Sequence, residues 1–251
     1  MANYWDAVNN VIQQADILLI ILDARLVDET RNIEIEQKVK NSNKPLIYVI
    51  TKCDLVDDKK DVEKYKKSLK PCVFISAIKY YGVNLLRDKI LIEAKRNNIS
   101  LPAKVGVLGY PNVGKSSLIN AMIGRGSAST SMMSGHTKGV QRIKGDNSIT
   151  FLDSPGVIPF NEKDSTKHSI IGTTDFTRTK DPDLVVMEIM KKFPGKIEDY
   201  YDVKPNENFE QTIEDIAIKK NIIKKKNKPD IDKMARIILK DWQTGKIINL
   251  N

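Results

Sequence analysis

The sequence has few of the residues that stabilise secreted proteins and no long apolar segment. Only two cysteines occur in 251 residues, Cys53 and Cys72, which excludes a disulfide framework or a four-cysteine zinc site and favours a reducing environment. The longest fully apolar run, Ile17 to Leu22, is too short to cross a bilayer. Because the first residues also lack a basic stretch followed by an apolar one, we expect a cytoplasmic protein without a membrane segment.

Acidic residues are fewer than basic ones. The chain has 32 Asp and Glu against 41 Lys and Arg, a net charge of +9 that is compatible with a polyanionic partner but does not identify one. Apolar residues make up 41% and charged residues 29%, as in an ordinary globular protein. A chain of this length can form one large domain, or a medium domain and a small one.

Apolar runs rich in β-branched residues predict buried strands, and helical stretches lie between them. The helical stretches cover residues 58–69 and 84–97, long enough for right-handed crossovers between parallel strands. We therefore predict an α/β fold with a mainly parallel sheet. The predicted strands cover residues 16–22, 45–50, 72–75, 105–108 and 149–152.

Beyond about residue 175 the strand pattern stops. Helices are predicted over residues 184–193, 209–218 and 231–243, separated by prolines. The sequence thus predicts an α/β domain over residues 1–175 and a small all-helical domain over residues 176–251. Residues 219–240, called the basic segment below, hold nine Lys or Arg and two Asp.

The clearest motif is GYPNVGKS, from Gly109 to Ser116, which matches the phosphate-binding pattern GxxxxGK[ST]. A predicted strand leads into it and a helical stretch leads out. In such a loop, backbone N–H groups surround a β-phosphate at a helix N-terminus. Lys115 would add charge at the β- and γ-phosphates, and the Ser116 hydroxyl would bind Mg²⁺.

A second motif, DSPG, follows the predicted strand at residues 149–152. Asp153 suits a carboxylate that holds Mg²⁺ through water, and the N–H of Gly156 suits a γ-phosphate. Residues 126–140 between the two motifs are rich in Ser, Thr and Gly, as expected of a switch loop. We assign its Mg²⁺ and γ-phosphate contact to Thr137, although the stretch offers several hydroxyl groups.

Two segments match [NT]KxD, the pattern that reads guanine with a carboxylate. NKPD at 227–230 has the usual position after DxxG, but the lysine-rich residues before it cannot form a buried strand. TKCD at 51–54 follows a run that can be a central strand, and Cys72 to Ile75 then leads to a Ser-Ala turn at Ser76, whose backbone N–H groups suit guanine O6. We therefore assign guanine recognition to Asp54, with Thr51 and Lys52 supporting the loop, although this requires a circularly permuted domain.

With its motifs in this order, the sequence resembles the circularly permuted GTPases of the YlqF/YawG type. The resemblance implies a permuted P-loop sheet, hydrolysis of GTP to GDP and phosphate, and a role in ribosome assembly, at the large subunit. Asp23-Ala24-Arg25 is similar to the DAR signature of that family; Asp23 and Arg25 can contact nucleotide or serve structure alone. A small-subunit assembly GTPase of the YjeQ type would need an N-terminal barrel and a zinc site, for which the residues are absent.

Hydrolysis of GTP needs a group that orients the attacking water molecule, and the sequence has no obvious residue for this task. Signalling GTPases place a glutamine directly after DxxG, but here the residue is Val157, and the Pro-Gly-His segment that some members of the family use is missing. His136 adjoins Thr137 and is the candidate, with a solvated loop histidine as the alternative. Asn112 offers a carbonyl oxygen to a potassium ion beside the phosphates, or else only supports the loop.

These inferences define three sets of residues. The predicted catalytic residues are Lys115, Thr137, Gly156 and His136. The predicted metal ligands are Ser116, Thr137 and Asp153 for Mg²⁺ and Asn112 for a possible K⁺. The predicted nucleotide-binding residues are Thr51, Lys52, Asp54, Ser76, Ala77, Ile78, Gly109, Pro111, Asn112, Val113, Gly114, Lys115, Ser116 and Ser117.

We expect a monomeric GTP-gated ribosome assembly factor whose basic segment contacts rRNA phosphates. A solvated helix face is the alternative for that segment. A GTP-gated switch that binds a protein unrelated to ribosomes is the alternative function, and a metabolic nucleotidase is disfavoured because a second substrate motif is missing.

Overall fold

The computed structural model describes residues 4–56, 59–124, 140–160, 162–225 and 227–247. The chain divides into two compact units, Met1–Glu162 and Lys163–Asn251. The sequence placed this boundary after residue 175. Helix α6, Ser165–Ile171, contacts α7 and α10 and so falls in the second unit.

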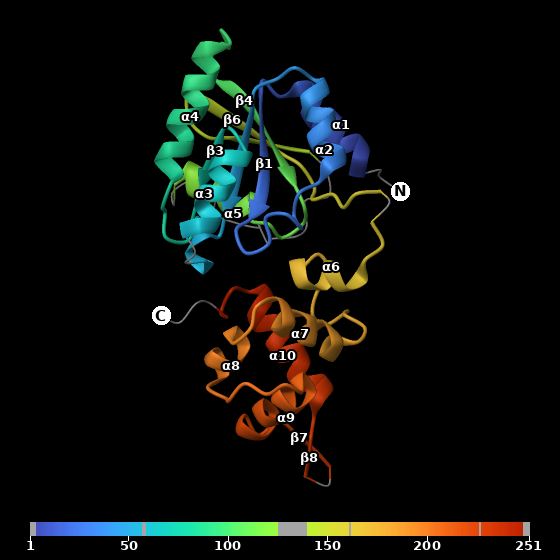
Figure 1. The fold of residues 1–251 in the computed structure, drawn as a ribbon. Helices are drawn as coiled ribbons and strands as arrows, with labels where there is room; N and C mark the ends of the chain where they lie inside the picture. The colour runs from blue at the N-terminus through green and yellow to red at the C-terminus, as the bar shows by residue number, and fades with distance from the viewer. Residues whose placement is uncertain (1–3, 57–58, 125–139, 161, 226, 248–251) are drawn as a thin grey trace. The chain divides into compact units, whose positions relative to one another are not determined.

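The first unit is built on a six-stranded sheet in the order β3-β2-β1-β4-β6-β5 (Figure 1). Neighbouring strands are parallel except β5, which pairs antiparallel with β6. The mainly parallel α/β sheet is thus confirmed. Strand β5 was not predicted, because its sequence QRIK is largely exposed and has no apolar run. The strands are β1 Ile17–Asp23, β2 Leu46–Thr51, β3 Cys72–Phe74, β4 Ala103–Gly109, β5 Gln141–Lys144 and β6 Ile149–Asp153.

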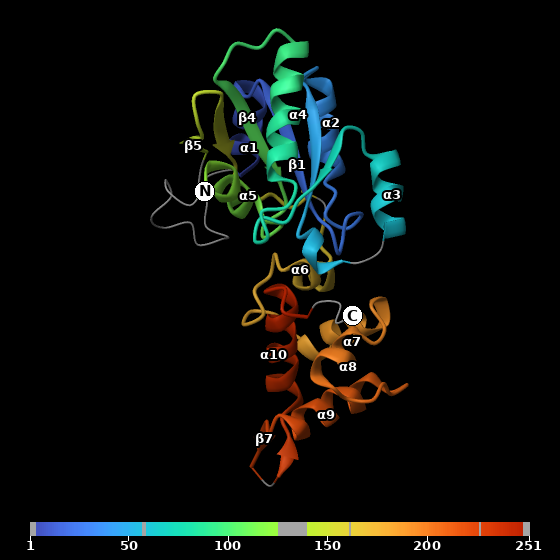
Figure 2. The same cartoon turned by 90° about the vertical axis from the view of Figure 1, so that its left-hand side faces the viewer.

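Helices cover both faces of this sheet. Figures 1 and 2 show α1, Tyr4–Gln14, and α2, Ile33–Asn41, on one face, with α4, Val83–Arg96, and α5, Lys115–Ile123, on the other. Helix α3, Lys59–Ser68, contacts the edge strand β3. The predicted helices α3 and α4 are present, whereas α1 and α2 were not predicted.

The alternation of side chains along the strands explains why the central strands read as continuous apolar runs. Leu18, Ile20 and Leu22 of β1 belong to the core beneath α1 and α2, so the intervening residues face the opposite side. All seven residues of β1 are buried. Gly106 lets α1 approach β4 closely, because a Cβ there would lie 2.8 Å from side-chain atoms of Leu18 and Val11. A strand covered on both faces needs apolar residues at every position.

The strand register brings the motifs to one edge of the sheet. Asp23 of β1 pairs with Thr51 of β2, Ile21 pairs with Gly109, and Val107 pairs with Asp153. The carboxyl ends of these four parallel strands therefore lie at the same edge of the sheet, with an offset of two residues between β1 and β4 and again between β4 and β6. This edge is where open α/β sheets bind ligands.

In its described residues, the second unit has helices and one short hairpin as its regular structure. Its core includes Trp242, which is 1% exposed and whose Nε1 donates to Ile170 O at 3.0 Å. Arg236 donates to the carbonyls of Phe176 and Thr179, which closes the loop between α6 and α7 over α10. The remaining helices are α7 Pro182–Lys192, α8 Lys196–Tyr201, α9 Phe209–Lys219 and α10 Ile231–Gln243.

The hairpin corrects the expectation of an all-helical domain and gives NKPD a local structural explanation. Strands β7, Ile223–Lys224, and β8, Lys228–Pro229, pair antiparallel. Asn227 has φ 56°, a left-handed conformation that asparagine tolerates in turns. Asp230 is the N-cap of α10, accepting from the Lys233 N–H at 3.1 Å. The motif thus spans a turn and a helix cap and does not follow a buried strand.

Candidate functional site

The GYPNVGKS loop joins β4 to α5 and has the conformation of a phosphate loop. Gly109 has φ 147°, and a Cβ there would lie 2.6 Å from Ile21 O, so only glycine fits. Lys115, 7% exposed, donates through Nζ to Tyr110 O at 2.5 Å and Gly109 O at 3.2 Å. Burial lowers the pKa of the Lys115 amine to about 8, against the opposing charge of Asp153. An anionic phosphate beside this amine would stabilise its charged form.

Three further predicted nucleotide-binding residues lie in or directly after this loop, namely Pro111, Val113 and Ser117. Val113 is buried, Pro111 is half-buried, and Ser117 is exposed on the first turn of α5. Gly114, with φ 99°, is the residue before α5. The backbone N–H groups of the first turn of a helix have no partner within the helix and are available to an anion.

The DSPG motif leaves β6 directly beside this loop. The Ser116 Oγ and Asp153 Oδ2 atoms lie 3.5 Å apart, and Asp153 is 1% exposed. A hydroxyl and a carboxylate are oxygen ligands of the kind that Mg²⁺ prefers, with phosphates and waters supplying the rest. Within the described ranges, no group of three His, Cys, Asp or Glu side chains could hold a metal ion, so a metal here would rely on such external ligands.

Gly156 lies against the phosphate loop. A Cβ at Gly156 would lie 2.4 Å from Pro111 N and 2.9 Å from Lys115 Nζ. No residue with a side chain fits this position without displacing the loop. The structure therefore places Gly156 next to the amine of Lys115, which the sequence analysis assigned to the β- and γ-phosphates. The tight packing of Gly156 was not predicted.

The TKCD loop is bonded directly to the phosphate loop. The Thr51 hydroxyl bonds the carbonyls of Leu22, at 2.9 Å, and Val113. Lys52, with φ 57°, donates through Nζ to Asn112 O at 2.8 Å. Threonine thus links the loops in place of the asparagine of NKxD. The half-buried Asp54 follows in a short 3₁₀ turn, Cys53–Leu55.

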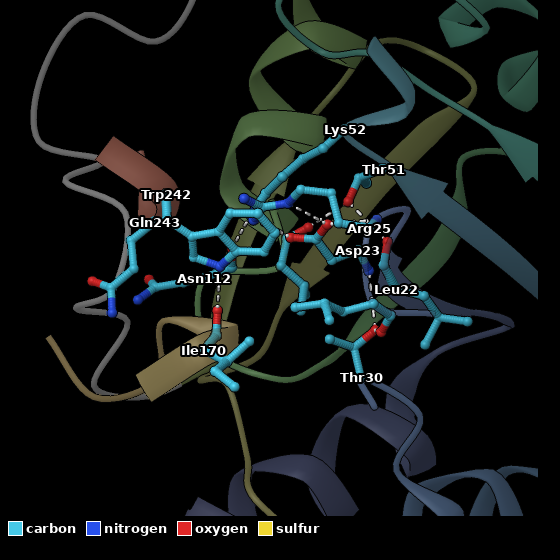
Figure 3. A network of polar contacts seen from close by, with 12 residues as sticks. Leu22, Asp23, Arg25, Thr30, Thr51, Lys52, Asn112, Ile170, Trp242 and Gln243 are labelled. Atoms are coloured by element: carbon cyan, nitrogen blue, oxygen red, sulfur yellow. Dashed lines mark hydrogen bonds and ion pairs between the residues drawn. The ribbon is translucent and has the colours of Figure 1, made fainter. Parts of the chain in front are cut away.

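Asp23 and Arg25 of the DAR signature support Lys52 (Figure 3). Asp23 Oδ2 accepts from Lys52 Nζ at 2.7 Å and from Arg25 Nη2 at 2.8 Å, and the Asp23 and Arg25 side chains are 1% and 3% exposed. Burial raises the pKa of Asp23, but the charges of Arg25 and Lys52 outweigh it and hold the pKa well below its ordinary value. Of the two interpretations, this geometry favours a structural role that acts through Lys52.

The Ser-Ala turn adjoins the TKCD loop, because Cys53 N–H donates to Ile75 O at 3.2 Å. Ser76 is fully buried and its Oγ accepts from Lys79 N–H at 3.1 Å, which fixes the turn. Ala77 is half-buried, and Ile78 is 81% exposed. The turn therefore offers backbone N–H groups at the same edge as Asp54.

Two predicted residues, Thr137 and His136, lie outside the described residues. The structure also brings in Asn32, which the sequence reasoning missed, and whose amide contacts Val157 O at 3.3 Å. An asparagine ahead of an Ile-Glu-Ile-Glu run signals a helix N-cap, but no local signal predicts a contact 125 residues away.

A strand-loop-helix for phosphate, a DxxG segment beside it, and a [NT]KxD loop bonded to the phosphate loop define a P-loop GTPase domain in circularly permuted order. Comparison with known proteins agrees. The model of the 50S ribosome-binding GTPase family matches residues 104–234, about half of the chain. A second model, described as ethanolamine utilisation - propanediol utilisation, matches residues 1–91. The chain belongs to the 50S ribosome-binding GTPase family.

Two relatives and a solved structure match nearly the whole of this chain. An uncharacterised GTP-binding protein of Methanocaldococcus jannaschii is 35% identical over 96% of this chain and 65% of its own length. Nucleolar GTP-binding protein 2 of Saccharomyces cerevisiae is 30% identical over 97% of this chain and 52% of its own length. The chain thus spans less than two thirds of these relatives. GNP-bound YlqF from T. maritima has the same fold, with a TM-score of 0.65 at 22% identity over 97% of this chain and 94% of that chain.

We predict that Asp23→Asn weakens guanine nucleotide binding roughly tenfold, because Lys52, which the sequence assigns to the base-reading loop, loses the charged hydrogen bond that fixes its side chain. Titration of fluorescent GDP would measure this. The free energy of unfolding of the variant should also fall by about 3 kcal/mol, because the charges of Arg25 and Lys52 would be left without the carboxylate that neutralises them.

Glu36→Gln is the matched control for Asp23→Asn. Glu36 is also a buried carboxylate, but it binds Arg31 and Tyr48 instead of Lys52. It should lower the free energy of unfolding while leaving GDP affinity unchanged. Equal GDP affinity in the two variants would contradict the role given to Asp23.

Proposed function

We propose that this chain binds GTP and hydrolyses it to GDP and phosphate at the carboxyl edge of its sheet. The observation that supports this best is the bonding of the TKCD loop to the phosphate loop through Thr51 and Lys52. That bonding holds the loop that carries Asp54, the proposed guanine-reading carboxylate, against the loop proposed to bind the phosphates. Membership of the 50S ribosome-binding GTPase family points to the same reaction.

In the proposed reaction, water attacks the γ-phosphorus and the bond to the β–γ bridging oxygen breaks, leaving GDP and phosphate. Lys115 and the N–H of Gly156 stabilise the charge that develops on the phosphoryl oxygens. P-loop GTPases use Mg²⁺, which supplies further charge compensation when held by Ser116 and Asp153. Val157 is 3% exposed and apolar, so it cannot orient the water. We keep Thr137 and His136 as the proposed metal ligand and water-positioning group.

Substitution of the aspartate in each [NT]KxD segment tests which segment recognises guanine. Asp54→Asn should reduce GDP affinity at least about a hundredfold, because Asp54 is assigned two charge-assisted bonds to guanine, and should increase XDP affinity, because the amide can donate to the xanthine carbonyl. Asp230→Asn keeps a side-chain cap on α10 and should leave GDP affinity unchanged. Calorimetric titration of both variants measures this, and loss of binding only in Asp230→Asn would reverse the assignment.

We also propose that potassium stimulates hydrolysis through the Asn112 side chain. Asn112 is exposed on the phosphate loop with φ 61°, and its backbone carbonyl is engaged by Lys52. A cation beside the phosphates would compensate charge as an arginine finger does. Equal turnover in potassium chloride and sodium chloride would contradict this proposal.

The proposed biological role is a nucleotide-gated factor in ribosome assembly, acting at the large subunit. The family description names 50S ribosome binding, and one relative is a nucleolar GTP-binding protein. A ribosomal partner agrees with the monomeric state and cytoplasmic location that we propose. Within the part of the chain that the structure describes, no helix is both long and apolar enough to cross a membrane.

The basic segment is the proposed rRNA contact. Some of its charge is used internally, since Lys219 binds Asp202, Lys224 binds Asp230 and Arg236 binds Asp232. Other described lysines of the segment are exposed on α10, on the β7–β8 hairpin and in the turn before it. Exposed lysines suit phosphate contacts without base selectivity. They are Lys220, Lys225, Lys228, Lys233 and Lys240.

Co-sedimentation with isolated ribosomal subunits tests this role. We expect large-subunit binding that needs a non-hydrolysable GTP analogue and is weaker with GDP. A triple Lys→Gln variant at 225, 228 and 233 should bind more weakly and show a salt dependence shallower by about two counterions. The matched control removes three exposed lysines elsewhere in the second unit, Lys180, Lys191 and Lys204.

The outcomes separate the candidate functions. Equal loss in both triple variants would exclude a specific role for the basic segment. Binding to neither subunit in either nucleotide would leave a GTP-binding protein and favour the alternative, a switch that binds a protein partner. Binding to such a partner should depend little on salt.

A further inference from the structure

The residue that follows DSPG is held on both sides by hydrogen bonds. Val157 N–H donates to Gly109 O at 3.3 Å, and Val157 O accepts from the Asn32 Nδ2 atom at 3.3 Å. Both residues are buried, Val157 at 3% exposure and Asn32 at 2%. The peptide groups around Val157 are therefore fixed to the phosphate loop on one side and to the start of α2 on the other.

Asn32 has two contacts that need different atoms of its side chain. Its Oδ1 accepts from Ile35 N–H at 3.1 Å and caps α2, while its Nδ2 donates to Val157. Asp, Ser and Thr cap helices as well as Asn does, but an aspartate has no donor. Capping alone therefore does not require asparagine, whereas the bond to Val157 requires an amide or another donor that reaches it.

Helix α2, which Asn32 caps, packs against the core through buried side chains. Ile35 and Val39 of α2 are 1% and 0% exposed in the core beneath the sheet. Glu34 accepts from Phe160 N–H at 3.4 Å, and Tyr110 OH donates to Glu162 at 2.9 Å. Val157, Phe160 and Glu162 are thus each bonded to α2, to its N-cap or to the phosphate loop, and the bond from Asn32 is the one at the DSPG end.

The position of Gly156 follows from that of Val157. Gly156 is the preceding residue, and it already lies against Pro111 and near Lys115 Nζ. Its own N–H is the group assigned to the γ-phosphate. The two peptide groups that follow this N–H are both held, the first by Gly109 O and the second by Asn32, which restricts the directions in which the Gly156 N–H can point. GDP lacks the γ-phosphate, so its binding does not depend on this restriction.

We propose that Asn32 is a positioning residue for GTP: through Val157 it holds Gly156 where its N–H meets the γ-phosphate. This inference rests on the proposed function, since it assumes that GTP is the ligand. Removing the amide donor should reduce affinity for a non-hydrolysable GTP analogue and the rate of turnover, while GDP affinity is retained. The measurable quantity is the ratio of the two affinities in each variant.

Asn32→Asp separates the two contacts, because it keeps the capping acceptor and loses the donor. In this variant we expect the affinity for the analogue to fall roughly fivefold or more relative to GDP. Asn32→Ala loses both contacts, so it should show the same change in ratio and a lower melting temperature. Asn208→Ala is the control, since Asn208 caps α9 in the second unit by accepting from Glu210 N–H.

Fluorescent-nucleotide titrations and thermal unfolding of the full chain decide the question. An unchanged ratio in both Asn32 variants would overturn the positioning role and leave only the cap. If Asn32→Asp does not fold, Asn32→Ala and Asn208→Ala are compared instead. A ratio of analogue affinity to GDP affinity that changes in Asn32→Ala alone supports the role. The same ratio in both variants overturns it. If the unsubstituted protein binds neither nucleotide, the proposed function fails instead.

Discussion

The site depends on the hydrogen bonds that join the TKCD loop to the phosphate loop across the end of strand β1. The strand order is β2-β1-β4, so the two loops leave strands that are not neighbours. Thr51 and Lys52 reach over this gap to the carbonyls of Val113 and Asn112. Asp23, at the end of β1, lies between them and binds Lys52. A buried carboxylate is costly by itself, but two cations and a fixed geometry compensate the cost.

This arrangement explains why a permuted chain can keep a P-loop GTPase site. The site is assembled at the carboxyl ends of parallel strands, and the register of those strands does not depend on which of them comes first in the chain. Asp23 pairs with Thr51 and Ile21 with Gly109 whatever the order of the connections. What permutation changes is the chain that leaves DSPG, which here continues into the second unit.

The central strands and the main loops could be predicted from the sequence, because a strand buried on both faces must be apolar throughout. Context also separated TKCD from NKPD, since only the former follows such a strand. Strand β5 and the β7–β8 hairpin could not be predicted, because exposed two- to four-residue strands carry no hydrophobic period. Helix α2 begins at a recognisable cap, Asn32, but the bond from that cap to Val157 joins residues 125 apart and has no local signature.

The anchoring of Val157 bears on how nucleotide state can act at a distance. If Gly156 moves on gain or loss of a γ-phosphate, the bonds of Val157 to Gly109 and Asn32 must lengthen or break, at a cost of about 1 kcal/mol each. Such a cost makes two discrete positions more stable than a continuum between them. The position after DxxG, which is glutamine in signalling GTPases, is here the buried Val157. The backbone N–H and C=O of Val157 carry the two bonds that fix the segment, but its buried, apolar side chain cannot hydrogen-bond a water molecule. Positioning of the attacking water is therefore left to another group.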